Sequence, residues 1–144
     1  MNQNGKNNED INYRPFVFGI EKIDAEHQRL IGIFNCLNEK AAKNESADFK
    51  QIVEELEEYS CYHFNTEETL MEKANFDEIE EHIYQHQIFR QKINDFKTSI
   101  LFGGSTLETD MVNFLRKWLL KHIAEVDAKY VPSIKKYLNQ EKTN

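Results

Sequence analysis

The chain contains five histidines, and all of them fall on stripes of apolar residues: His27, His63, His82, His86 and His122. A lone histidine on an apolar stripe is most simply a core residue with one hydrogen-bond partner. Buried imidazoles always need such partners, and five in one core would need many of them or a shared cation. Imidazoles with carboxylates and no cysteine ligand suit iron, zinc, copper or nickel. This pattern alone does not choose among those metals.

Two pairs of these polar residues have the spacing of one helical turn. His82 and His86 are four residues apart, and so are His63 and Glu67. Residues at i and i+4 lie on one face of a helix. One such pair can arise by chance or as a surface hydrogen bond, whereas two pairs on apolar stripes favour a set of ligands facing a core.

Four amphipathic segments carry these residues, and no strand pattern is present. Apolar residues recur at helical spacing over about residues 24–43, 47–74, 77–102 and 105–131. Short connections make neighbouring helices antiparallel. The sequence therefore predicts an all-α fold, an up-down-up-down antiparallel four-helix bundle.

Local signals set the expected boundaries. Asp24 is a candidate N-cap, Asp77 and Glu80 form a capping-box pattern, and Gly103-Gly104 ends the third helix. We expect Pro132 to break the fourth helix and residues 133–139 to form a short final helix. Residues 1–12 are polar and predict a flexible tail, and an extended arm with Pro15 and Gly19 follows. The predicted bundle domain is 13–139.

The antiparallel topology predicts that the polar residues meet. His27 lies near the start of the first helix, His82 and His86 near the start of the third, and the others near the ends of the second and fourth. At 1.5 Å per residue, all lie roughly 5–15 Å from the same end of the bundle. We therefore expect one polar layer.

The sequence resembles the hemerythrin family, including its bacterial members, over about residues 13–131. The resemblance rests on the order and spacing of seven polar residues: His27, His63-x-x-x-Glu67, His82-x-x-x-His86 and His122-x-x-x-x-Asp127. Neighbouring residues agree with it: Gly19-Ile20, Ile23-Asp24, Phe64 and Trp118-Leu119. Bacterial members often carry tryptophan in the arm, where this chain has Tyr13, Phe16 and Phe18.

The resemblance implies a pair of non-heme iron ions with an oxo or hydroxo bridge. In hemerythrins three histidines hold one iron, and they match His82, His86 and His122; two hold the other, and they match His27 and His63. The bridging carboxylates match Glu67 and Asp127. Such a set leaves one coordination position open, on the two-histidine iron, where dioxygen can bind.

The implied function is reversible dioxygen binding, for storage, delivery or sensing, and not catalysis. Reversibility needs a dry pocket, and the matching pocket residues are Phe64, Trp118, Leu119 and Ile123. One alternative is a di-iron oxidase or peroxidase on the same scaffold. Another is a bundle that binds zinc or no metal and serves as an interaction module.

Charge and composition restrict the partners. The net charge is −7 and no basic cluster is present, so nucleic acid and anionic membranes are poor candidates. The chain lacks a signal-peptide pattern and a membrane-spanning apolar run, so we expect a cytoplasmic protein. A protein partner for oxygen delivery is not identified. Cys36 and Cys61 lack metal-site spacing, and we expect reduced thiols.

The fourth helix presents a geometric conflict. His122 and Asp127 are five residues apart, which places them about 140° apart on an ideal α-helix. Glu125 lies nearer the face of His122, yet the family pattern selects Asp127. We therefore predict a local irregularity, such as a π-type turn, between His122 and Asp127.

Overall fold

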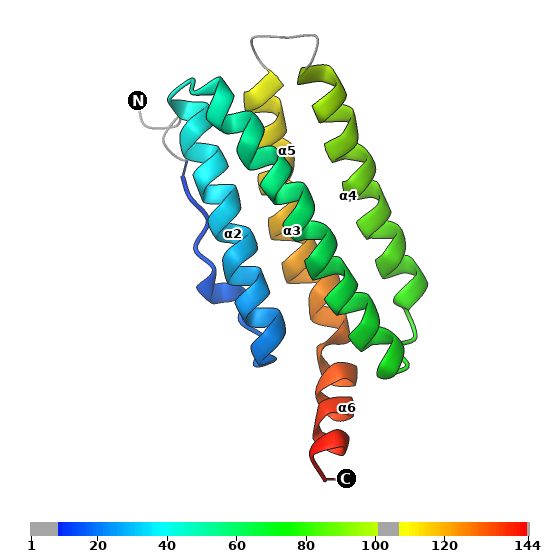
Figure 1. Cartoon of the computed structure of the whole chain (residues 1–144). Helices are drawn as coiled ribbons and strands as arrows, with labels where there is room; N and C mark the ends of the chain where they lie inside the picture. The colour runs from blue at the N-terminus through cyan, green and yellow to red at the C-terminus, as the bar shows by residue number, and fades with distance from the viewer. Residues whose placement is uncertain (1–8, 101–106, 144) are drawn as a thin grey trace.

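A computed structural model describes residues 9–100 and 107–143, and every regular element in these ranges is helical (Figure 1). The four long helices are α2 (Glu21–Ala42), α3 (Ser46–Lys73), α4 (Ile79–Ile100) and α5 (Leu107–Lys121). Shorter elements precede and follow them: η1 (Arg14–Phe16), η2 (His122–Val126), η3 (Asp127–Tyr130) and α6 (Val131–Thr143). No helix in the described ranges is long and apolar enough to cross a membrane.

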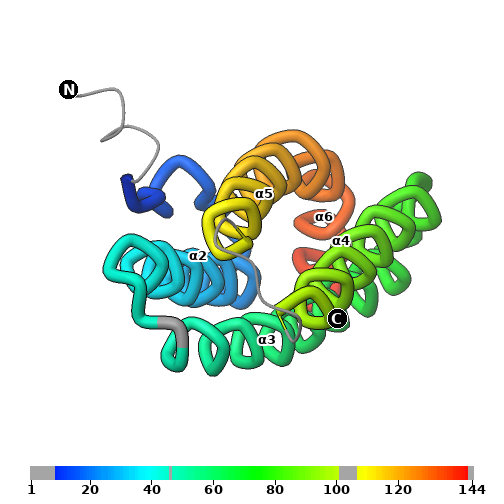
Figure 2. Tube along the Cα trace, turned by 90° about the horizontal axis from the view of Figure 1, so that it is seen from above, coloured from blue at the N-terminus to red at the C-terminus, as the bar shows by residue number. Residues whose placement is uncertain are grey.

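The four long helices form the predicted antiparallel bundle. Figure 2 shows α2, α3, α4 and α5 around a common axis, each beside its neighbours in the sequence. Two connections are short, and each contains an asparagine in the left-handed region, Asn44 at φ 57° and Asn75 at φ 54°. Asparagine tolerates this conformation better than most residues and commonly ends helices. The predicted Gly103-Gly104 turn lies outside the described residues.

The N-terminal arm packs along α2 and α5. Ile11 is buried, and its backbone exchanges hydrogen bonds with the side-chain amide of Asn35, at 2.7 and 3.0 Å. The guanidinium of Arg116 donates to the backbone carbonyl of Glu9. Of the predicted flexible tail, residues 1–8 lie outside the described residues. Packing against the bundle thus extends at least to Ile11, ahead of the expected boundary at residue 13.

The prediction that Asp24 caps the first helix was wrong. Helix α2 begins at Glu21, and Asp24 lies in its first turn. The Asp24 carboxylate accepts hydrogen bonds from the backbone N–H groups of Phe18 and Gly19, at 2.7 and 2.9 Å. Gly19 adopts φ 82°, a conformation that L side chains rarely adopt. The carboxylate therefore fixes the turn by which the arm enters the helix.

The interior consists of two apolar clusters with a polar layer between them. The larger cluster includes Leu30, Phe64, Phe89 and Leu119. The smaller one comprises Ile20, Ile23, Met71, Phe76, Tyr130 and Ile134. Along α2, His27 falls between Ile23 of the smaller cluster and Leu30 of the larger. The polar layer is therefore closed off from both directions along the bundle axis.

The fourth helix changes winding before Pro132. The α-helical hydrogen bonds of α5 give way to π-type winding over His122–Val126 and to 3₁₀ winding over Asp127–Tyr130. Helix α6 then begins at Val131, with Pro132 in its first turn, where a missing N–H costs nothing. The expected break at Pro132 was therefore wrong, and the final helix is longer than the predicted 133–139.

Candidate metal centre

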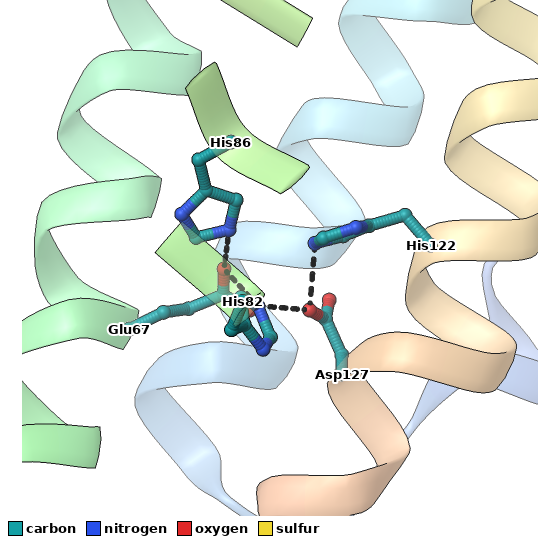
Figure 3. A group of neighbouring side chains, drawn as sticks. All are labelled: Glu67, His82, His86, His122 and Asp127. Carbon is teal, nitrogen blue, oxygen red and sulfur yellow. Dashed lines mark ion pairs between the residues drawn. The ribbon is translucent and has the colours of Figure 1, made fainter. Parts of the chain in front are cut away.

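All four helical segments of the bundle contribute side chains to one buried polar cluster. His27 comes from α2; His63 and Glu67 come from α3; His82 and His86 come from α4; His122 and Asp127 come from the rewound segment after α5. Each of these seven residues is at most 3% exposed. Figure 3 shows five of them converging from different helices. The prediction that these polar residues lie in one layer of the bundle is confirmed.

The π-type turn brings Asp127 to the cluster. Oδ1 of Asp127 lies 3.0 Å from Nε2 of His122, and the residue is fully buried. Glu125, which an ideal helix would place nearer that face, is exposed. The extra residue in the π-type turn rotates the chain so that Asp127 points inward. The predicted irregularity is confirmed.

The cluster divides into two groups that share both carboxylates. One group contains His82, His86 and His122 with Glu67 and Asp127; the other contains His27 and His63 with the same two carboxylates. Within each group, one ligand atom from every residue lies within 4.8 Å of the others. This arrangement fits two cations bridged by two carboxylates.

Each carboxylate directs one oxygen to each group. Glu67 Oε1 lies 3.1 Å from Nε2 of His86, while its Oε2 lies 3.3 Å from Nε2 of His63. Asp127 Oδ1 lies 3.0 Å from Nε2 of His82, while its Oδ2 lies 3.1 Å from Nε2 of His27. Two donors each about 2.1 Å from one ion, at a right angle, are about 3.0 Å apart. The spacing therefore fits pairs of ligand atoms that bind the same metal ion.

Several of these contacts are close without being hydrogen bonds. The Nε2 atoms of His82, His86 and His122 have no hydrogen-bond partner among the described residues, and neither do Oε1 of Glu67 and Oδ1 of Asp127. Buried polar atoms without partners are costly and rare in native proteins. All five atoms face the three-histidine group, where one cation would satisfy them. Oε2 of Glu67 and Oδ2 of Asp127 face His63 and His27, so the residues present also fit a second cation.

Without metal, the cluster is an array of buried ion pairs. Burial disfavours the imidazolium of His27, but Asp127 and Glu67 outweigh it and raise the pKa of His27 to about 9. The pKa of His82 rises to about 9 for the same reasons. Burial also opposes the charge on His63, but Glu67 and Glu26 raise the pKa of His63 to about 10. Burial opposes the charge on Glu67 too, yet His63 holds the pKa of Glu67 well below its usual range.

Two further carboxylates contact the outer nitrogens of the histidines. Nδ1 of His63 lies 2.8 Å from Oε1 of Glu26, and Nδ1 of His86 lies 2.7 Å from Oε2 of Glu68. Carboxylates at this position orient metal-binding imidazoles and increase their basicity. Neither Glu26 nor Glu68 was predicted to belong to the site. Adjacency to a candidate ligand was the available signal, since Glu26 precedes His27 and Glu68 follows Glu67.

Aromatic rings cover the three-histidine group. Phe64 stacks on His86, with ring centroids 3.8 Å apart; Trp118 stacks on His122 at 4.2 Å; Tyr130 stacks on His82 at 5.5 Å. The Tyr130 hydroxyl also donates a hydrogen bond to Oε2 of Glu67 at 2.6 Å. Burial, with the charges of Glu67 and Asp127, raises the pKa of Tyr130 well above its ordinary value, which preserves this donor.

The residues predicted to line an oxygen pocket lie beside this cluster. Phe64, Leu119 and Ile123 are almost completely buried and belong to the larger apolar cluster. Trp118 is half-buried and packs against the same cluster. Cys36 and Cys61 are exposed and unpaired, away from the buried layer.

Comparison with known proteins agrees with this geometry. The hemerythrin HHE cation binding domain family matches residues 19–134. The chain belongs to this family. It is 30% identical to a bacteriohemerythrin of Pseudomonas paraeruginosa, over 85% of this chain and 79% of the relative. It is 29% identical to a bacteriohemerythrin of Clostridium acetobutylicum, over 81% of this chain and 94% of the relative.

Other hemerythrins are similar in sequence or fold. The chain is 26% identical to myohemerythrin-1 of Phascolopsis gouldii, over 84% of this chain and 88% of the relative. A crystal structure of wild-type hemerythrin superposes with a TM-score of 0.69 at 24% identity, over 79% of this chain and 88% of that chain.

In this hemerythrin chain, the arm contributes directly to the centre, because the Phe18 ring meets His27 edge-on at 5.5 Å.

Proposed function

We propose that this chain binds dioxygen reversibly at a di-iron centre held by seven ligands: His27, His63, Glu67, His82, His86, His122 and Asp127. The proposal rests mainly on the division of these residues into two groups that share both carboxylates. Two irons, when bound, supply the electrons and the coordination position that reversible oxygen binding requires. The family match and the bacteriohemerythrin relatives support the same proposal.

The two groups differ in their number of imidazoles, and this difference supports an open coordination position in the two-histidine group. One group offers three imidazoles and the other offers two, while each receives one oxygen from each shared carboxylate. A six-coordinate ion in the two-histidine group therefore has fewer protein ligands. We infer that the small exogenous ligand is accommodated on the side of His27 and His63.

The surroundings favour a carrier, storage or sensing role over catalysis. The carboxylates of Glu26 and Glu68 are engaged by imidazole nitrogens, and the Tyr130 hydroxyl is engaged by Glu67. Phe64, Leu119 and Ile123 exclude water from the larger cluster's side of the centre. With the nearby acids held in place, rapid proton delivery to the reacting oxygen is disfavoured.

Oxygen cycling tests the proposal. The full chain is loaded with ferrous iron without oxygen, its iron content is measured, and visible absorption is followed while oxygen and inert gas alternate. We expect two irons per chain and bands that appear and disappear over several cycles. Steady oxygen consumption in the presence of reductant would indicate an oxidase. One metal per chain, or preferred retention of zinc, would contradict the proposed centre.

A further inference from the structure

A surface groove leads to the buried centre at His82. Its volume is about 130 Å³, and it lies between the start of α4 and the rewound segment after α5. It is lined by Phe76, Glu78, Glu81, His82, Gln85, Val126 and Lys129. Three larger cavities are lined by none of the seven candidate ligands. The groove therefore connects solvent with a residue of the centre itself.

His82 links the groove to the centre through its two ring nitrogens. Nε2 lies 3.0 Å from Oδ1 of Asp127 and therefore faces the shared carboxylates. Nδ1, on the other side of the ring, is buried and has no hydrogen-bond partner among the described residues. The residue is only 2% exposed. Because His82 lines the groove, this nitrogen is available as a partner for a water molecule or a cation that enters it.

Exposed carboxylates line the outer part of the groove. Glu78 and Glu81 are both exposed, and Glu78 lies 3.7 Å from the ammonium of Lys129, which is also exposed. Gln85 donates a hydrogen bond to Glu81 at 3.3 Å. Two carboxylates against one ammonium leave the opening net negative. Such a field raises the local concentration of cations.

One wall of the groove is built from irregular helix. Val126 ends the π-type turn and Lys129 lies in the 3₁₀ turn that follows. The backbone here departs from regular α-helical hydrogen bonding, which lowers the cost of a local opening. The same segment carries His122 and Asp127, so an opening on this side would expose ligands of both groups.

We propose that this groove is the route by which a divalent metal ion reaches the buried centre. Glu78 and Glu81 attract the ion, and His82 is the first imidazole that it meets. This inference rests on the proposed function, because it requires a metal centre behind His82. It gives Glu78 and Glu81, which would not be ligands of the loaded centre, a role in metal uptake.

Uptake kinetics test the route with a signal that does not depend on oxygen binding. Trp118 is the chain's single tryptophan and stacks on His122, so its fluorescence should report metal arrival. Ferrous iron is mixed without oxygen with the metal-free full chain, whose helicity is first checked by circular dichroism. For the double variant Glu78→Gln with Glu81→Gln, we expect uptake about 3- to 10-fold slower at low salt. High salt should remove this difference, and final iron content should be unchanged.

A matched pair controls for total charge. The double variant Glu54→Gln with Glu58→Gln removes two exposed carboxylates from α3 and should leave the uptake rate at the parent value. Gln85→Phe should narrow the groove and slow uptake and release together. Release is measured by transfer to a chelator from the loaded chain, so it does not require a folded metal-free state.

The outcomes distinguish this inference from the proposed function. Slower uptake in the groove variants, with parent rates in the Glu54 and Glu58 control, would support the route. A parent that binds two irons at the same rate as the groove variants would overturn the route alone. A parent that binds no metal would overturn the proposed function and the route with it.

Discussion

Nε2 of His122 lies 3.0 Å from Oδ1 of Asp127, although the two residues are five positions apart on one helix. A regular α-helix would separate these positions by about 140°. The π-type winding of His122–Val126 removes the discrepancy. Asp127 then approaches the histidines of both groups, with Oδ1 near His82 and Oδ2 near His27.

Replacing Asp127 with asparagine should therefore disrupt both metal positions. The amide offers one oxygen where the carboxylate offers two, and it carries no charge. We expect the iron content of Asp127→Asn to fall from two per chain to one or fewer. Glu125→Gln, on the exposed side of the same turn, should retain two irons. Loss of iron in Glu125→Gln with retention in Asp127→Asn would reverse our assignment.

The sequence predicted the bundle and its polar layer because both follow from periodicity. Helical spacing of apolar residues defines the inward faces, and short connections fix the antiparallel order. His27, His63 and His82 must then lie at similar depths along the axis. The distortion near Asp127 was predicted from the resemblance to the hemerythrin family, which selects Asp127 over Glu125, because two residues five apart cannot share a face of a regular helix.

Other features could not be predicted, because they depend on contacts between helices. Glu26 and Glu68 each adjoin a candidate ligand, but adjacency in the sequence does not show which imidazole of another helix a side chain contacts. The error at Asp24 has a similar origin. Its carboxylate binds the backbone of the arm, and the orientation of the arm is set by packing against α2 and α5.

The carboxylates at the outer nitrogens should control metal affinity separately in the two groups. Glu26 contacts His63 of the two-histidine group, and Glu68 contacts His86 of the three-histidine group. We expect Glu26→Gln and Glu68→Gln each to weaken one metal position about 10- to 100-fold. Chelator competition, followed by the iron remaining per chain, measures the loss. Exposed Glu72, on the same helix as Glu68, supplies the matched Glu72→Gln control, which should bind iron like the parent.

Metal-free protein should become less stable as pH rises above neutrality. The pKa of His27 and His82 is raised to about 9 and that of His63 to about 10. Groups with a raised folded-state pKa stabilise the fold fully below their unfolded pKa of about 6.5 and lose that contribution as pH rises through the folded value. Urea unfolding in the presence of chelator should therefore show a falling free energy of unfolding between about pH 6.5 and 10.

Loading with metal should reverse this trend. Imidazoles bind metals in their neutral form, so protons compete with iron for His27, His63 and His82. Apparent metal affinity should rise with pH over the same interval, and the stabilisation that iron provides should rise with it. If the free energy of unfolding changed with pH in the same way for loaded and metal-free protein, the assignment of these histidines as ligands would be contradicted.

The proposed oxygen pocket can be tested by comparing two leucines of α5. Leu119 and Leu115 are 1% and 0% exposed, and both belong to the larger apolar cluster. Leu119 precedes His122 by three residues, whereas Leu115 lies one turn further from the centre. Each leucine-to-alanine replacement should cost about 2–5 kcal/mol of stability, because it removes buried methyl groups and leaves a cavity.

The two replacements should differ in their effect on the oxygenated state. A cavity beside polar ligands can admit water, whereas a cavity lined only by apolar side chains stays dry. Water near the centre would assist protonation and irreversible oxidation of the irons. We therefore expect Leu119→Ala to shorten the life of the oxygenated chain severalfold, with Leu115→Ala close to the parent. The measurement is the decay of oxygen-dependent visible absorption at a temperature where all three proteins remain folded. Equal decay for the two variants would show that Leu119 contributes only packing, and that other residues keep the pocket dry.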